Sequence, residues 1–184
     1  MKKSLIAILA LLLALSVFTA CGKKDTANTI KDGKTLTDVM TAVDAKFAEK
    51  YGADYGAVAM PMPVDNQYLT DMLSIDTSFV EESAGNIAMS MTNSDILIGL
   101  TAKEGKADAL RTALEKRRDD LIAQYQTYPV NGSYERAKSG EVYQKGNYLF
   151  LIVVGVMPDN MDAALNFAPD VEMVKGTIDS MFNA

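Results

Sequence analysis

Apolar residues recur with two different spacings along the chain, and the spacing indicates where helices and strands lie. Every third or fourth residue is apolar in three stretches, a period typical of amphipathic helices. These stretches are residues 36–51, residues 106–128, which Pro129 ends, and residues 171–182, for which Asp170 is the expected cap. We therefore predict three main helices.

Two regions between these helices have the patterns of strands instead. Apolar and polar residues alternate over residues 87–92, and residues 95–100 are apolar on both faces. Residues 141–145 precede the two-residue turn Gly146-Asn147, and the continuously apolar residues 148–156 follow it. We therefore predict two antiparallel hairpins.

The remaining stretches have weaker patterns. Glycine and proline over residues 53–65 indicate loop or extended chain, whereas residues 65–73 and 76–82 are interpreted as short helices. Asp159 and Asp162 follow a proline and are typical of a helix start.

The predicted order is helix, hairpin, long helix, hairpin, helix. This order predicts one α+β domain over residues 35–184, with an antiparallel sheet of about four strands packed with three or more helices. The strands at residues 95–100 and 148–156 have no polar face, so we expect helices to cover both sides of the sheet.

The first twenty residues have the pattern of a signal peptide. Lys2 and Lys3 precede an apolar run over residues 5–18. As a helix this run would span about 21 Å, which is less than the roughly 30 Å hydrocarbon core of a bilayer. A cleaved signal peptide over residues 1–20 therefore fits better than a transmembrane helix.

Phe18, Thr19 and Ala20 directly precede Cys21, and this sequence resembles the lipobox of bacterial lipoproteins. The resemblance implies that Cys21 becomes the diacylated first residue of the mature protein. Residues 21–34 would then comprise the lipidated cysteine and a flexible polar tether. This places the domain on the outer face of the bacterial cytoplasmic membrane, held by its lipid. The alternative is an ordinary signal peptide followed by an unrelated cysteine.

Composition excludes several kinds of chemistry. The chain has no His and one Cys, so it has no histidine-dependent catalytic set, no imidazole metal ligand and no internal disulfide. Removal of Lys2 and Lys3 with the signal peptide leaves 16 basic residues against 24 acidic ones, a net charge of −8. This charge argues against nucleic-acid binding, and we expect neither a cofactor nor a metal.

Arg117 and Arg118 interrupt the apolar line of the long helix, so one of them lies at or near its buried face, and Arg117 is the first candidate for a ligand-binding residue. A guanidinium near a buried face needs a carboxylate partner or an anionic ligand, and Asp95 is the expected partner. Arg117 can instead pack its stem and extend its head into water. Tyr148, at the start of the second apolar strand, is a further candidate for ligand binding.

Two methionine pairs have different expected roles. Met89 and Met91 share a strand face with Ile87, which predicts that they pack in the core. Met60 and Met62 fit an adaptable contact surface. The alternative for both pairs is Cu(I) binding by their thioethers.

Several segments resemble one family when they are taken in order. They are NSDILIGL at residues 93–100, LEKRR at 114–118, YQTYP at 125–129 and KGNY at 145–148. With the lipobox before them they resemble domain-of-unknown-function family 4358, whose members are bacterial lipoproteins. In its pattern Asp95 opens a strand, Arg117 lies in mid-helix and Gly146, Asn147 and Tyr148 start the last strand. The resemblance implies an extracytoplasmic location and a fold, but no catalytic residue.

Two functional hypotheses follow. In the first, the protein is not an enzyme and binds a small ligand or an envelope protein. In the second, it is a hydrolase of envelope glycan, which needs two carboxyl groups about 5–10 Å apart in a cleft. The candidate carboxylates are Asp65, Asp71, Asp76, Glu81, Glu82 and Asp95. A shallow apolar patch that includes Met60 or Met62 would favour binding.

Overall fold

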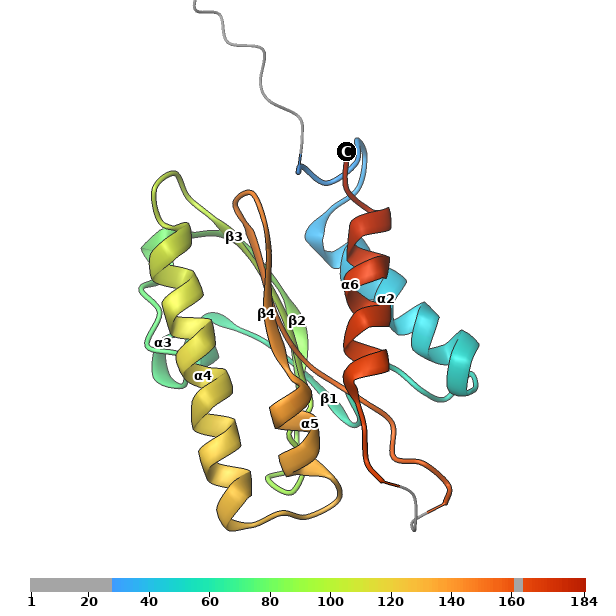
Figure 1. Cartoon of the computed structure of the whole chain (residues 1–184). Coiled ribbons are helices and arrows are strands. Elements are labelled where there is room, and N and C mark those ends of the chain that lie inside the picture. The colour runs from blue at the N-terminus through green and yellow to red at the C-terminus, as the bar shows by residue number, and fades with distance from the viewer. Residues whose placement is uncertain (1–27, 161–163) are drawn as a thin grey trace, which may run out of the picture.

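The computed structural model describes residues 28–160 and 164–184, and these residues form one antiparallel sheet between two layers of helices (Figure 1). The strand order is β1-β2-β3-β5-β4. The strands are β1 (Pro61–Pro63), β2 (Val80–Ala88), β3 (Ile96–Ala102), β4 (Glu141–Lys145) and β5 (Tyr148–Val153). The predicted α+β class is confirmed.

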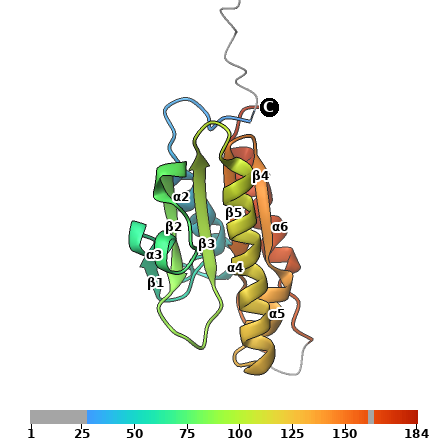
Figure 2. The same ribbon diagram turned by 90° about the vertical axis from the view of Figure 1, so that its left-hand side faces the viewer.

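Helices cover both faces of the sheet, as the two apolar strands require (Figures 1 and 2). One layer comprises α2 (Leu36–Tyr51) and α6 (Ala168–Ser180). The other layer comprises α3 (Asn66–Asp71), α4 (Ala107–Thr127) and α5 (Ser133–Ser139). A single 3-10 turn, Thr77–Phe79, precedes β2.

The central strand β3 is buried along its whole length because it contributes to two separate cores. Ile98 and Leu100 pack in the core beneath α4. Leu97 packs in the core beneath α2 and α6. Alternate side chains of a strand point to opposite faces, so a strand between two helix layers is apolar at every position.

The N-terminal end of the described chain pairs with the C-terminal end. Ile30 forms a β-bridge with Phe182. The amide of Lys31 donates to the carbonyl of Met181 at 3.0 Å, and the amide of Asn183 donates to the carbonyl of Thr29 at 2.8 Å. The predicted tether is therefore held against the domain from Thr29 onward.

The predicted signal peptide and Cys21 lie outside the described residues. Within the described part of the chain, no helix combines the length and the apolar character needed to cross a bilayer.

The first hairpin lies earlier in the sequence than its pattern indicated. The helix predicted over residues 76–82 is wrong beyond Phe79, because β2 already begins at Val80. β2 carries few apolar side chains and is held largely by backbone pairing with β3. Its sequence therefore lacks the alternation of apolar and polar residues that predicts a strand. The short strand β1, in the stretch predicted as loop or extended chain, extends the sheet to five strands.

The prediction that Met89 and Met91 pack in the core is wrong. β2 ends at Ala88, and the two methionines lie in the loop between β2 and β3, where they are 62% and 86% exposed. Ile87, still inside the strand, is buried as expected. The alternation over residues 87–92 therefore reflects a loop rather than the face of a strand.

The C-terminal predictions need two further corrections. α6 begins at Ala168, so Asp170 lies in its first turn and is not its cap. Asp159 lies in a loop and does not start a helix, and residues 164–167 are also loop. Asp162 lies outside the described residues. The short helix α5 was not predicted, because seven residues are too few to show a helical period.

Gly85 tests the close pairing of β2 with β3. A Cβ at this position would lie 2.0 Å from the carbonyl oxygen of Leu97, and its φ of +133° disfavours any L side chain. We expect Gly85→Ala to lower the free energy of unfolding in urea by about 2 kcal/mol or more. The control is Gly176→Ala in α6, where no atom lies within 4 Å of the new Cβ. It should raise stability by roughly 0.5–1 kcal/mol. Equal effects of the two variants would contradict this packing.

Candidate functional site

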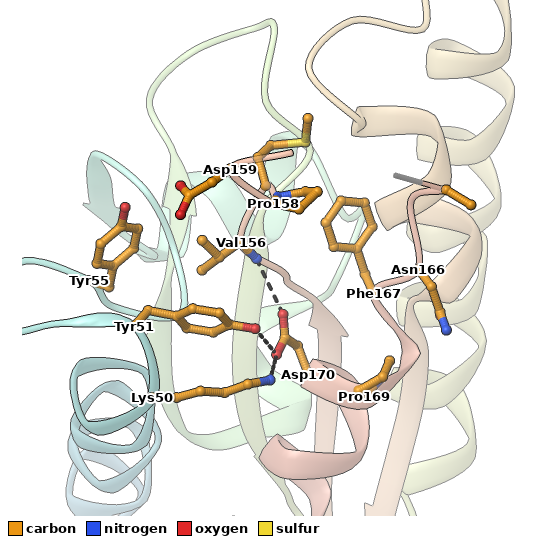
Figure 3. Close-up of a pocket in the computed structure, with 12 residues that line it drawn as sticks. Lys50, Tyr51, Tyr55, Val156, Pro158, Asp159, Asn166, Phe167, Pro169 and Asp170 are labelled. Carbon is orange, nitrogen blue, oxygen red and sulfur yellow. Dashed lines mark hydrogen bonds and ion pairs between the residues drawn. The ribbon is translucent and has the colours of Figure 1, made fainter. Parts of the chain in front are cut away.

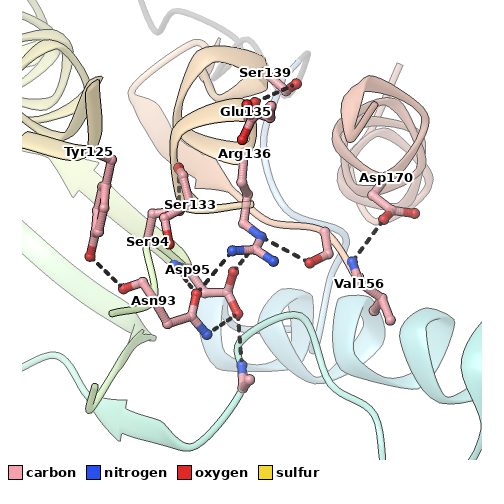
Figure 4. Close-up of polar contacts among 12 residues, drawn as sticks. Asn93, Ser94, Asp95, Tyr125, Ser133, Glu135, Arg136, Ser139, Val156 and Asp170 are labelled. Atoms are coloured by element: carbon pink, nitrogen blue, oxygen red, sulfur yellow. Dashed lines mark hydrogen bonds and ion pairs between the residues drawn. The ribbon is translucent and has the colours of Figure 1, made fainter. Parts of the chain in front are cut away.

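A buried ion pair lies at the end of the sheet where β3 begins (Figure 4). Asp95 directly precedes β3, and Arg136 extends toward it from α5. The Nε atom of Arg136 lies 2.9 Å from Oδ1 of Asp95, and both residues are 4% exposed. Such a pair needs further hydrogen bonds to offset its desolvation.

Backbone and amide groups supply these hydrogen bonds (Figure 4). The Nε–H of Arg136 points to the carbonyl of Gly155 at 2.9 Å, so its contact with Asp95 Oδ1 is electrostatic rather than a second hydrogen bond. Oδ2 of Asp95 accepts from the amide of Ala59 at 3.1 Å and from Nδ2 of Asn93 at 2.9 Å. Burial raises the pKa of Asp95, and the charge of Arg136 opposes this rise. The pair therefore ties together α5, the β2–β3 loop, the exit from β5 and the chain before β1.

The β2–β3 loop is fixed by hydroxyl groups as well. The phenol of Tyr125 on α4 lies 3.0 Å from the carbonyl of Met91 and 2.9 Å from that of Asn93. The hydroxyl of Ser133 on α5 lies 2.8 Å from the carbonyl of Thr92. These contacts hold the backbone of the loop while its methionine side chains remain exposed.

Next to this loop lies a groove of about 350 Å³, which we call the methionine groove. Four methionines that line it are 41–86% exposed: Met62 from β1, Met72 at the end of α3, and Met89 and Met91 from the β2–β3 loop. Arg117 and Leu121 of α4 and Tyr68 of α3 also line the groove. Figure 2 faces this side of the molecule, with the β2–β3 loop beside α4.

Oδ1 of Asp95, which also lines the groove, accepts no hydrogen bond but is ion-paired with Arg136. Two donors of the groove have no hydrogen-bond partner among the described residues. They are Nε of Arg117 and the hydroxyl of Tyr68, and both atoms are buried. A buried donor without an acceptor costs about 1–3 kcal/mol relative to a satisfied one. A ligand that supplied an acceptor would recover that free energy.

A second pocket, of about 380 Å³, surrounds Asp170 (Figure 3). Its carboxylate accepts from Lys50 and Tyr51 at 2.6 Å each and from the amide of Val156 at 3.2 Å. Burial lowers the pKa of Lys50, but its hydrogen bonds and charge interactions with Asp170 and Tyr51 together outweigh burial, so the pKa rises. The buried carboxylate is therefore satisfied within the protein, so this pocket offers a ligand less than the groove does.

The structure brings two of the three predicted binding residues to the same place. Arg117 and Asp95 both line the methionine groove. The prediction that they pair is wrong, because the partner of Asp95 is Arg136. Tyr148 lies at the other end of β5, where its ring packs edge-on against Phe182 at 5.0 Å. Arg136 was missed because the helix that carries it shows no period.

Several carboxylates proposed for hydrolysis have structural roles instead. Asp65 caps α3 and Asp76 caps the 3-10 turn, each through a backbone amide. Asp71 accepts from Gln67 one turn earlier on α3. Within the described ranges, no three acidic or cysteine side chains gather as ligands for a metal ion.

The fold and site define an α+β domain with a buried ionic centre and an adjacent open groove. The chain belongs to the family described as Domain of unknown function (DUF4358), whose profile matches residues 54–154. The matched region runs from before β1 to the end of β5 and contains Asp95, Arg117 and Arg136. No curated protein and no solved structure matches the chain. The family resemblance seen in the sequence is thus confirmed.

Removal of one partner tests the Arg136–Asp95 pair. Arg136→Met should lower the free energy of unfolding by about 3–5 kcal/mol, because Asp95 would stay buried without its counter-charge. Adding Asp95→Asn to that variant should cost less than the sum of the two single changes. The control is Arg118→Met, which breaks an exposed pair with Asp119 and should cost about 1 kcal/mol or less. Chemical denaturation measures all four variants, and an Arg136→Met cost no larger than that of the control would refute this role.

Proposed function

We propose that this protein is a non-enzymatic binding module, anchored by lipid on the outer face of the bacterial cytoplasmic membrane. Its binding site is the methionine groove. The observation that carries the proposal is the gathering of four exposed methionines, from three separate segments, around one groove. Exposed apolar groups that cluster in this way mark interaction sites more often than chance positions on a surface.

The side chains and the backbone of the groove have complementary properties. Methionine is unbranched and polarisable, so it adapts to apolar partners of different shape. The backbone that carries Met91 is held by Tyr125, so the groove exists before a ligand arrives. A preformed site avoids the entropy cost of ordering a loop on binding.

The hydrolase hypothesis has less support. The buried carboxylate of Asp95 faces the guanidinium of Arg136 and not a second carboxylate, so the paired acids that hydrolysis needs are not evident there. Thioethers also bind Cu(I). However, the positive charge of Arg117 in the same groove disfavours a metal cation.

The anchor rests on the lipobox-like sequence that ends at Cys21. An anchor at Cys21 is also compatible with access to the groove, because the groove lies far from the N-terminal end of the domain. Ile30 pairs with Phe182, and Tyr148 at the start of β5 packs against the same ring. Tyr148 pairs with Thr101 near the end of β3, whereas the groove lies where β3 begins. The chain therefore enters the domain at the opposite end of the sheet from the groove (Figure 1).

The anchor is tested by Cys21→Ser. Without the thiol no acyl chain can be attached at this position, so the variant should leave the membrane fraction or accumulate unprocessed at the size of the full chain. Fractionation and metabolic labelling with palmitate measure both results, with Ser16→Ala in the apolar run as the control. A Cys21→Ser protein that stays in the membrane at mature size would refute lipid anchoring.

The groove is tested with Nile red, a neutral apolar dye. The experiment uses residues 22–184, which we call the soluble domain. We expect it to enhance the fluorescence of Nile red in a saturable way. The double variant Met89→Lys, Met91→Lys should bind the dye with an affinity lower by about tenfold or more. The matched control is Met60→Lys, since Met60 is 65% exposed but lines a different pocket. Binding that survives the double change, or that the control weakens equally, would count against the groove as the site.

A further inference from the structure

The methionine groove is lined by charged residues as well as by its four exposed methionines. Among the described residues that line it, Arg117 carries the positive charge and Asp95 the negative charge. Asp95 is already paired with Arg136, and no ion pair or hydrogen bond of Arg117 is present in this part of the chain. The groove therefore has an unbalanced positive charge beneath an apolar rim.

Arg117 also differs from its neighbours on α4. Arg111 pairs with Glu115, Lys116 pairs with Asp120, and Arg118 pairs with Asp119. Each of those pairs lies on the exposed side of the helix, where water would solvate a lone charge at little cost. The Nε of Arg117 is instead buried without an acceptor.

A second donor accompanies this guanidinium. Tyr68, from α3, lines the same groove, and its hydroxyl is also buried without a partner. Both residues interact electrostatically with the phenol of Tyr125. Burial raises the pKa of Tyr125 most, Arg117 lowers it, and Tyr68 raises it by a smaller amount. An N–H and an O–H that converge on one groove suit an oxygen anion that accepts from both.

We infer that the groove binds the C-terminal end of a peptide whose last residues are apolar, with the terminal carboxylate held by Arg117 and Tyr68. The inference rests on the proposed function and adds the class of ligand. One guanidinium balances one carboxylate, whereas a phosphate dianion would be less well compensated in a mature chain of net charge −8.

The rim favours a peptide over a single hydrocarbon chain. Methionines from three segments offer contacts that can adjust to side chains of different shape. The methionines that line the groove are 41–86% exposed, so the groove is accessible from solvent and a peptide bound there can continue out of it. Capture of a C-terminal carboxylate by backbone amides is a recurrent mode of peptide recognition, and here side-chain donors would take that role.

Titration calorimetry of the soluble domain with two matched probes tests the inference. The probes are acetyl-glycyl-leucyl-phenylalanine with a free carboxylate and the same peptide as its C-terminal amide. The wild type should bind the acid about tenfold more tightly than the amide, because only the acid offers a charged acceptor. Arg117→Met should reduce this preference to less than about twofold. Tyr68→Phe should weaken acid binding without lowering stability, since it removes a buried hydroxyl that has no partner.

Arg118→Met is the matched control, because Arg118 is adjacent in sequence but does not line the groove. It should retain the full preference for the acid. Equal affinity of the wild type for acid and amide would overturn the inference, as would tighter binding of decanoate than of the peptide acid. If Nile red still depends on Met89 and Met91 in those cases, the groove stands and only the ligand class is wrong.

Discussion

The arrangement of this domain depends on the ion pair between Arg136 and Asp95. It is buried where the sheet ends, and its hydrogen bonds reach the exit from β5 through Gly155 and the chain before β1 through Ala59. A charged pair in this position is costly unless its remaining hydrogen-bonding capacity is used. The satisfied groups fix the end of the β2–β3 loop where it enters β3, and that loop supplies half of the methionines of the groove. The geometry of the binding surface is therefore a consequence of electrostatics in the interior.

Satisfied and unsatisfied polar groups lie close together in this molecule. The carboxylates of Asp95 and Asp170 each accept from several donors, and both join elements distant in sequence. In contrast, Nε of Arg117 and the hydroxyl of Tyr68 are buried without an acceptor among the described residues, and both residues line the groove. Folding alone does not benefit from such an arrangement, because each unsatisfied buried group lowers stability. The proposed binding function would benefit from it, because a ligand would supply the missing acceptor.

The sequence predicted the parts of the fold that repeat a pattern over many residues. The period of α2 and α4 and the apolar runs of β3 and β5 were sufficient, because burial on one or both faces imposes them on every residue. Local patterns were too short for α5, and the pairing of β2 depends on partners distant in the sequence. The site was therefore predicted in part. Arg117 and Asp95 were chosen from their chemistry, but the true partner of Asp95 lies 41 positions away on the unpredicted helix. Met89 and Met91 were predicted to pack in the core for a similar reason, since the alternation of apolar and polar residues does not reveal where a strand ends.

The claim that the methionine groove is the binding site can be tested most directly by NMR of the soluble domain with ¹³C-labelled methionine methyl groups. Titration with acetyl-glycyl-leucyl-phenylalanine should shift the methyl signals of Met62, Met72, Met89 and Met91, which surround the groove. The signal of Met40, buried beneath the opposite face of the sheet, should not move. Saturable shifts confined to the four groove methionines are the predicted result. Shifts centred on other methionines, or no shift at concentrations that saturate the calorimetric signal, would contradict the account.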